Sequence, residues 1–255
     1  MKVCLLNDSF PPMLDGVANT VQNYASVMKT DELADAVVVT PAYPDADYSI
    51  YPYKIYPYTS FNISELIYGY RAGNPLARRA LMDIRRFSPD IIHTHCPFAS
   101  TLMARLARVE TRAPIVFTYH TKFESDICKT LKKKFLRREA VNLVINNISA
   151  CDEVWTVSRG AGEDLKAIGF KGEYRVMQNG VDFEKGRVSD ELVREVTGGL
   201  DLPEDVPVFL FVGRLIDYKG LPLIAEALKM LSAEGIDYRM VFVGGGLDRK
   251  GLGGE

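Results

Sequence analysis

The chain has 255 residues, with 31 Lys and Arg against 33 Asp and Glu, and a formal net charge of −2. Apolar residues make up 47% and charged residues 25%, a globular composition that excludes a disordered or fibrous chain. The near-neutral charge removes the global electrostatic case for a nucleic-acid partner, and no apolar run reaches the roughly 18–20 residues that span a bilayer. The four cysteines are widely spaced, which favours reduced thiols over a zinc cage or a disulfide framework.

Short apolar runs alternate with helical patterns from the first residues onward. The apolar runs predict strands at residues 2–6, 36–40, 54–58, 90–95, 115–120, 153–158 and 174–178. Helices are predicted between most of them, at residues 17–29, 76–87, 99–107, 127–149 and 160–168. Strands that are apolar throughout are typical of a parallel sheet covered by helices on both faces. The sequence therefore predicts an α/β, doubly wound, Rossmann-like domain.

A polar segment at residues 185–205 interrupts this alternation and predicts a linker that contains a short helix. The β/α pattern then resumes with strands at 206–213 and 239–244 and a helix at 220–233. We therefore expect an N-terminal domain over residues 1–184, a linker over 185–205, and the start of a second Rossmann-like domain over 206–255.

Residues 41–58 hold four prolines and six tyrosines. This composition favours an extended connection with packed rings over a sugar-stacking surface. Asp45 and Asp47 within it have the D-x-D spacing that could hold a divalent metal. A solvated turn is the favoured interpretation, so no metal site is predicted there.

The three histidines are candidate site residues. His93 and His95 are predicted to face the same side of one strand, with no third metal ligand at hand because His120 follows a separate strand. His120 ends an apolar strand, and ligands of parallel α/β sheets bind at the C-terminal strand ends. It is therefore a candidate ligand contact, and the alternative is a histidine that only ends the strand.

Two strand-to-helix junctions suit a phosphate. Gly16 follows the first strand, where a glycine lets a ligand approach the helix N–H groups, although a tight turn explains it equally well. At the second junction, Arg214 offers a planar fork for phosphate oxygens and Lys219 a point charge near a helix N-terminus. The pair could stabilise a departing diphosphate without a metal, and a solvated charged loop is the alternative.

A basic stretch occupies residues 128–138, which contain six positive charges and no acid. Apolar residues recur beside the charges at Ile127, Leu131 and Phe135. This pattern predicts contact with an anionic membrane surface, and the alternative is a solvated basic face. The predicted contact residues are Lys132, Lys133, Lys134, Arg137 and Arg138.

Six segments together resemble retaining glycosyltransferases of family GT4, which have the GT-B fold. They are NDSFPPMLDGVANTVQNYA, PDIIHTHCPF, PIVFTYHTKFE, VWTVSRGAGEDL, VMQNGVDFEKG and FVGRLIDYKGLPLIAEAL, and they occur in family order. The resemblance implies two Rossmann-like domains, with the acceptor mainly on the first and a UDP- or GDP-linked sugar on the second, and with no cofactor and no metal. The basic stretch is similar to that of diacylglycerol glucosyltransferases, and phosphatidylinositol mannosyltransferases are also similar. The implied acceptor is a lipid or a saccharide.

The resemblance also assigns roles to individual residues. His120 would contact the transferred sugar as the catalytic-site histidine. Arg214, Lys219 and Gly16 would bind the donor diphosphate, and Gly213, Gly244 and Gly245 would lie near the nucleotide. The segment that contains Asn179, Gly180 and Asp182 would form the domain junction.

One family feature is not found. The family uses an E-x7-E motif after later strands of the second domain, whereas the spacing from Glu226 to Glu234 falls on a predicted helix and is rejected. We therefore expect a chain that is truncated within the donor domain and is inactive by itself. We expect it in the cytoplasm or at the inner face of the membrane. The alternatives are a non-catalytic sugar- or lipid-binding domain and a GT-B-type nucleotide-sugar epimerase.

Overall fold

The computed structural model divides the chain into two compact units, Met1–Phe183 (unit 1) and Glu184–Glu255 (unit 2). The residues that it describes are 1–13, 15–63, 71–120, 127, 133–181, 186–200, 202–203, 205–213, 215 and 219–245.

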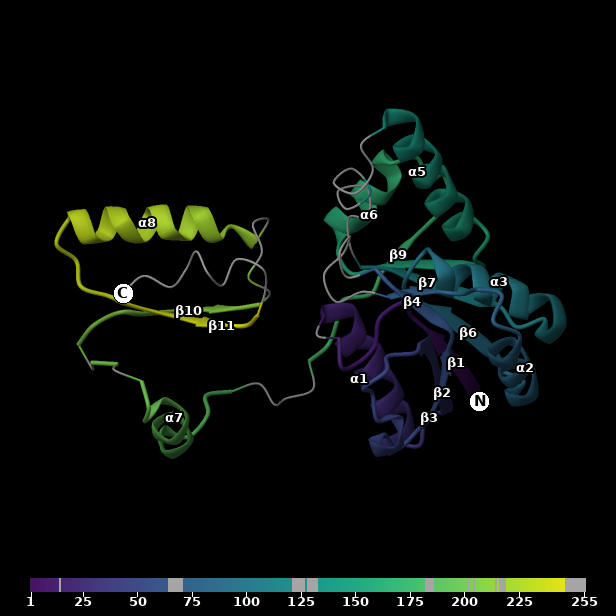
Figure 1. Ribbon diagram of the computed structural model, residues 1–255, viewed down its shortest axis with the longest axis horizontal. Coiled ribbons are helices and arrows are strands. Elements are labelled where there is room, and N and C mark those ends of the chain that lie inside the picture. Colours follow the sequence, from purple (N-terminus) through teal and green to yellow (C-terminus); the bar gives the residue numbers. More distant parts are fainter. Residues whose placement is uncertain are drawn as a thin grey trace. The chain divides into compact units, whose positions relative to one another are not determined.

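Unit 1 is built on a seven-stranded sheet in the order β3-β2-β1-β6-β7-β8-β9, and every neighbouring pair is parallel (Figure 1). The strands are β1 (Lys2–Leu6), β2 (Asp35–Pro41), β3 (Lys54–Tyr58), β6 (Ile91–Thr94), β7 (Ile115–Tyr119), β8 (Glu153–Thr156) and β9 (Arg175–Val176). The strand order reverses between β1 and β6. This reversal is the topological switch point at which doubly wound sheets bind their ligands.

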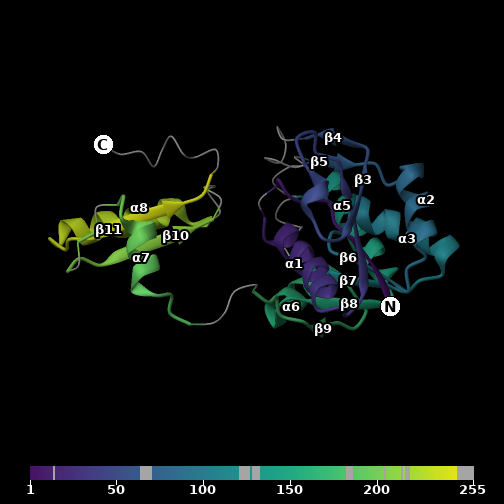
Figure 2. The same ribbon diagram turned by 90° about the horizontal axis from the view of Figure 1, so that it is seen from below.

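Helices cover both faces of this sheet, as the continuous apolar strands predicted. They are α1 (Gly16–Thr30), α2 (Arg78–Phe87), α3 (Ala99–Thr111), α5 (Lys134–Ser149) and α6 (Arg159–Ala167). The helix α1 lies on one face, and α2 and α3 lie on the other (Figure 2).

Strand alternation decides which residues face each helix layer. In β1, Val3 and Leu5 belong to the core beneath α1, whereas Cys4 and Leu6 belong to the core beneath α2 and α3. Ile92 of β6 joins the second of these cores. Because side chains alternate along a strand, the next residue, His93, points to the α1 face.

The structure differs from the predicted elements in several places. An antiparallel pair, β4 (Ser60–Asn62) with β5 (Arg71–Gly73), was not predicted, because its strands are too short to show a pattern. Strand β9 is shorter than predicted because it lies at the sheet edge and pairs only with β8. The predicted helix 127–149 corresponds to α5 from Lys134 onward, and residues 128–132 lie outside the described residues.

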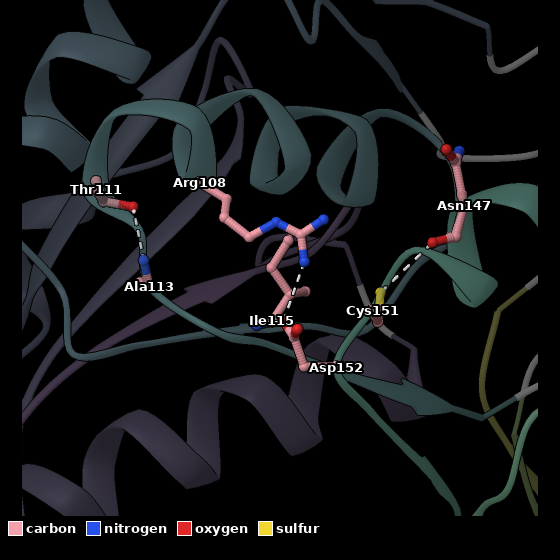
Figure 3. A network of polar contacts seen from close by, with 7 residues as sticks. All are labelled: Arg108, Thr111, Ala113, Ile115, Asn147, Cys151 and Asp152. Atoms are coloured by element: carbon pink, nitrogen blue, oxygen red, sulfur yellow. Dashed lines mark hydrogen bonds and ion pairs between the residues drawn. The ribbon is translucent and has the colours of Figure 1, made fainter.

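A polar network ties α3 and α5 to the start of β7, at the end of the sheet opposite the strand C-termini (Figure 3). Asp152 Oδ2 accepts a hydrogen bond from the Ile115 N–H at 2.7 Å and pairs with Arg108 at 3.0 Å. On α5, Asn147 accepts from Arg105 at 2.6 Å and donates to the Pro97 carbonyl at 2.7 Å. The loop that follows β6 is therefore anchored to α5, and Arg105 links the same asparagine to α3.

Unit 2 contains α7 (Asp190–Thr197), β10 (Val208–Val212), α8 (Leu221–Ala233) and β11 (Arg239–Val243). Strands β10 and β11 form a two-stranded parallel sheet. The side chains of β10 are mostly exposed, with Leu210 at 64% and Val212 at 70%, and those of β11 are mostly half-buried. None of the helices in the described part of the chain combines the length and the apolarity needed to cross a membrane.

Candidate functional site

Three strand ends meet at the switch point of unit 1. Asp8 follows β1, His95 follows β6, and His120 follows β7. The pairing of β1 with β6 and of β6 with β7 makes these ends neighbours. The His95 N–H extends the ladder by donating to the Leu6 carbonyl at 3.0 Å.

All three histidines of the chain gather at this edge. The His93 and His95 rings lie 4.1 Å apart, which confirms that they face the same side of β6. His95 Nδ1 lies 2.9 Å from His120 Nε2. His120 follows a separate strand, as predicted, and the parallel pairing of β6 with β7 brings the two strand ends together.

Side chains from three other elements hold the histidines. His93 Nε2 forms a 2.7 Å hydrogen bond with Thr118 Oγ1 of β7. The Tyr24 ring, on α1, lies 5.7 Å from the His95 ring, and Trp155 of β8 meets the His93 ring edge-on at 5.1 Å. The cluster is thus packed from the helix side and along the sheet. Sequence reasoning missed Tyr24, Thr118 and Trp155, because only the strand order brings them to the histidines.

Burial keeps the three histidines neutral. Removal from water disfavours the charged imidazolium and lowers the pKa of His93 to about 3 and of His120 to about 4. For His120, the negative charge of Asp15 opposes this loss of basicity. The same desolvation lowers the pKa of His95 well below its usual value, and His93 and His120 add to the effect. Neutral imidazoles donate at one nitrogen and accept at the other.

Asp8 is a buried carboxyl that the sequence analysis did not assign to the site. Its Oδ1 accepts from the Ser100 N–H at 2.7 Å, in the first turn of α3, and from the Tyr58 hydroxyl at 3.4 Å. Burial raises its pKa, and hydrogen bonds from Cys96, Ser100 and Tyr58 oppose the rise. The end of β1 is therefore fastened to α3. The sequence feature that could have identified Asp8 is an acidic residue just after an apolar strand.

Gly16 is the first residue of α1, at the same edge. Asp15 caps this helix by accepting from the N–H groups of Val17 and Ala18, both at 2.8 Å. Apart from its chain neighbours and the backbone of its own helix, no heavy atom of the described residues lies within 4 Å of the position that a Cβ on Gly16 would take. The surroundings of Gly16 are open to a ligand, but two of the α1 N–H groups are already bound to a carboxylate.

Of the two predicted diphosphate residues of unit 2, Lys219 lies at the start of α8. Lys219 directly precedes Gly220, the N-cap residue, whose φ is +80°. No side-chain hydrogen bond caps this helix among the described residues, and its first turn has no acid. Arg214 lies outside the described residues. The described part of this junction has a lysine beside a helix N-terminus, which suits an anion.

The predicted nucleotide-proximal glycines lie where β10 and β11 end. Gly213 donates to the Val243 carbonyl at 2.9 Å, and Gly245 accepts from the Leu215 N–H at 2.9 Å. A Cβ on Gly244 would collide with the Gly213 carbonyl, and both of these residues have φ of +154°. The close approach of two backbones requires a glycine at position 244 whatever the ligand.

The remaining predicted positions are spread over the chain. Asn179 and Gly180 lie in an exposed irregular segment shortly before the boundary between the units, and Asp182 lies outside the described residues. Of the basic stretch, Lys133 and the first five residues of α5 are described, and Lys132 is not.

The sequence analysis rejected two acidic pairs as functional motifs, Asp45 with Asp47 and Glu226 with Glu234. Asp47 caps a short 3-10 helix, Tyr48–Ile50, by accepting from the Ser49 N–H at 2.9 Å. Glu226 lies on α8 and Glu234 is its C-cap residue. Within the described ranges, no group of three or more His, Cys, Asp or Glu could hold a metal ion.

Two family models match the sequence. Glycosyltransferase Family 4 covers residues 14–185, and Glycosyl transferases group 1 covers residues 194–253. The first of these matches spans more than half of the chain. The protein therefore belongs to glycosyltransferase family 4.

Named relatives agree with this family. The alpha-monoglucosyldiacylglycerol synthase of Streptococcus pneumoniae is 22% identical over 254 residues, 96% of this chain and 56% of that protein. The GDP-mannose-dependent alpha-mannosyltransferase of Corynebacterium glutamicum is 27% identical over 267 residues, 99% of this chain and 59% of that protein. The chain thus spans a little over half the length of these two relatives.

Among solved structures, HepE of Anabaena in complex with UDP and glucose superimposes with a TM-score of 0.67 at 16% identity, covering 96% of this chain and 69% of that one. A glycosyltransferase of Rickettsia africae gives a TM-score of 0.64 at 16% identity, covering 95% of this chain and 60% of that one. These likenesses show the fold, which is of the GT-B type.

Proposed function

We propose that this chain forms the acceptor-side domain and part of the donor domain of a retaining hexosyltransferase. The enzyme would use a nucleotide sugar and need no metal. The observation that carries the proposal is the position of His120 beside His95 at the switch point of a family 4 sheet. Ligands of doubly wound sheets bind at this edge, and a neutral imidazole is suited to hydrogen-bond a sugar hydroxyl.

The donor diphosphate is assigned to the start of α8. Lys219 supplies a positive charge, and the α8 N-terminus supplies N–H groups that no side chain caps among the described residues. Both stabilise negative charge that develops on a leaving diphosphate. Arg214 and Gly16 complete the proposed set, and Gly213, Gly244 and Gly245 are assigned to the nucleotide. Asn179, Gly180 and Asp182 are assigned to the domain junction.

The acceptor is proposed to be a lipid, reached from an anionic membrane surface. Lys133 and Lys134 stand at the N-terminus of α5, whose first turn contains no acid. Positive charge is unfavourable at this end of a helix, and an anionic surface would offset the repulsion. Phe135 and Leu136 beside them are 64% and 44% exposed. The glycolipid named in the description of the pneumococcal relative supports the same choice.

Residues 1–255 by themselves are proposed to transfer sugar far more slowly than a longer chain. The described part of unit 2 contains one two-stranded sheet with exposed apolar side chains, a kind of sheet that is marginally stable alone. A donor sugar that is misplaced by about 1 Å can lose a hundredfold in rate.

The decisive experiment compares residues 1–255 with a chain extended over the rest of the region that the relatives cover. Both are given UDP- and GDP-hexoses, with and without diacylglycerol acceptors, in EDTA. We expect an α-linked product from the extended chain only. A new sugar without acceptor would favour the epimerase, sugar binding without any product would favour the binding domain, and a requirement for metal would overturn metal independence.

The membrane contact has its own test, sedimentation with anionic and with neutral vesicles. Each basic residue near an anionic surface contributes about 1 kcal/mol, so neutralising four lowers the affinity by roughly two to three orders of magnitude. The test variant carries glutamine at Lys133, Lys134, Arg137 and Arg138. The control removes the same charge from α2, with glutamine at Arg78, Arg79, Arg85 and Arg86. Equal loss of binding in the two variants would contradict a specific role for α5.

A further inference from the structure

The contact between His95 and His120 contains one shared proton. Both rings are neutral, and the 2.9 Å distance joins Nδ1 of His95 to Nε2 of His120. One of these nitrogens must donate and the other accept. The tautomer of His95 therefore dictates the tautomer of His120.

The remaining nitrogens distinguish the two arrangements. His95 Nε2 and His120 Nδ1 are both buried without a hydrogen-bond partner among the described residues. If His120 donates, the unpaired N–H falls on Nε2 of His95, a side chain with 0% exposure. If His95 donates, the unpaired N–H falls on Nδ1 of His120, an atom that is also buried, although the His120 residue as a whole is only partly buried. An N–H that stays unpaired in the interior is destabilising. Of the two rings only that of His120 is partly exposed, so a ligand at this edge of the sheet can come closer to the N–H of His120 than to that of His95.

We infer that His95 is a positioning residue: its Nδ1–H donates to Nε2 of His120 and holds His120 as the Nδ1–H tautomer. His120 then serves as a hydrogen-bond donor to a hydroxyl oxygen of a bound sugar, an assignment that rests on the proposed function for the identity of the ligand. In this tautomer Nδ1 carries a proton and Nε2 is already paired. His120 therefore has no nitrogen available to act as a base.

The packing around His95 supports this role. The His93 ring lies 4.1 Å away at an interplanar angle of 30°, and the Tyr24 ring approaches from α1 with its centroid at 5.7 Å. His93 is fixed in turn by its hydrogen bond to Thr118. Because packing already fixes the His95 side chain from two sides, it can orient His120 at little additional cost in conformational entropy. Functional sites are preorganised by supporting residues of this kind.

The test is nitrogen NMR of residues 1–255 with 15N-labelled imidazole rings at pH 7. The chain contains only three histidines, so single substitutions assign every ring. We expect His120 to be protonated at Nδ1 and His95 also at Nδ1. Protonation of His120 at Nε2 in the unsubstituted chain would overturn the inference without the need for any variant.

Two variants separate positioning from folding. Asn at position 95 places an amide N–H near the former Nδ1, whereas Phe fills the space without a donor. In His95→Phe the His120 ring should become a mixture of tautomers, and in His95→Asn it should stay protonated at Nδ1. A His120 tautomer that is unchanged in His95→Phe would contradict the inference.

The kinetic arm uses whichever chain forms product in the transfer assay. We expect kcat to fall about tenfold in His95→Phe, the effect of one hydrogen bond, and to recover to within about threefold in His95→Asn. Equal rates for the two variants would overturn the role in positioning. If no chain forms product, the proposed function fails, and the NMR result still decides the role of His95.

Discussion

Acid should destabilise unit 1 through its three histidines, by an amount that the structure defines. In the unfolded chain a histidine has a pKa of about 6.5. In the folded chain burial lowers the pKa of His93 to about 3 and of His120 to about 4. As the pH falls below 6.5, the histidines bind protons in the unfolded state but not in the folded state, so the free energy of unfolding decreases. The decrease ends when the pH reaches the folded-state values.

The expected magnitude depends little on the exact folded-state pKa values. Between pH 7.5 and pH 5.0 His93 and His120 each lower the free energy of unfolding by about 2 kcal/mol, since pH 5.0 lies about 1.5 units below the unfolded pKa. This holds for any folded pKa below about 4.5. The two together contribute about 4 kcal/mol, a large part of the roughly 5–15 kcal/mol that stabilises a domain, and His95, whose pKa burial lowers in the same direction, adds to the loss.

Urea unfolding at the two pH values, followed by fluorescence, measures this effect. The single tryptophan, Trp155, belongs to β8 and touches His93, so its emission reports on unit 1. In His93→Gln the amide can still bond to Thr118 but cannot titrate, and the pH-dependent loss should shrink by about 2 kcal/mol. Thr118→Val breaks the same hydrogen bond and keeps all three histidines. Its free energy of unfolding should therefore fall between pH 7.5 and pH 5.0 by as much as that of the unsubstituted chain. Parallel pH curves for His93→Gln and the unsubstituted chain would refute the reasoning.

Three further substitutions test the glycines and the lysine. Gly244→Ala should disrupt the pairing of β10 with β11, because its Cβ meets the Gly213 carbonyl, whereas the Cβ of Gly245→Ala meets no atom of the described residues within 4 Å. We expect faster amide exchange in β10 for Gly244→Ala alone. Gly16→Ala should leave the urea midpoint nearly unchanged, because its Cβ meets no described atom within 4 Å outside its own helix and chain neighbours, while it weakens nucleotide-sugar binding in calorimetry. Lys219→Ala should lower the turnover of the active chain by roughly two to three orders of magnitude, and near-normal turnover at saturating donor would contradict its place on the diphosphate.

The local elements of this protein could be read from its sequence. Apolar runs and helical periodicity predicted every strand of the seven-stranded sheet and each helix that covers it, because these patterns repeat over a few residues. The same is true of His120 as a strand-end histidine, and of the start of α8 as a junction with Lys219. The observed ends of some elements differ from the predicted ends. Strand β9, which pairs with a neighbour on one side only, is shorter than predicted.

The tertiary structure alone decided which of these residues meet. His120 contacts His95 over 25 positions of sequence, and Asp8 binds the Ser100 N–H over 92. Both contacts depend on the order β1-β6-β7, which arises from crossovers through helices and from the packing of whole layers. Hydrophobic periodicity carries no record of that order, since a strand shows the same pattern beside any parallel neighbour. The sequence by itself thus determined the elements and their sidedness, and the order of the strands in the sheet determined the site.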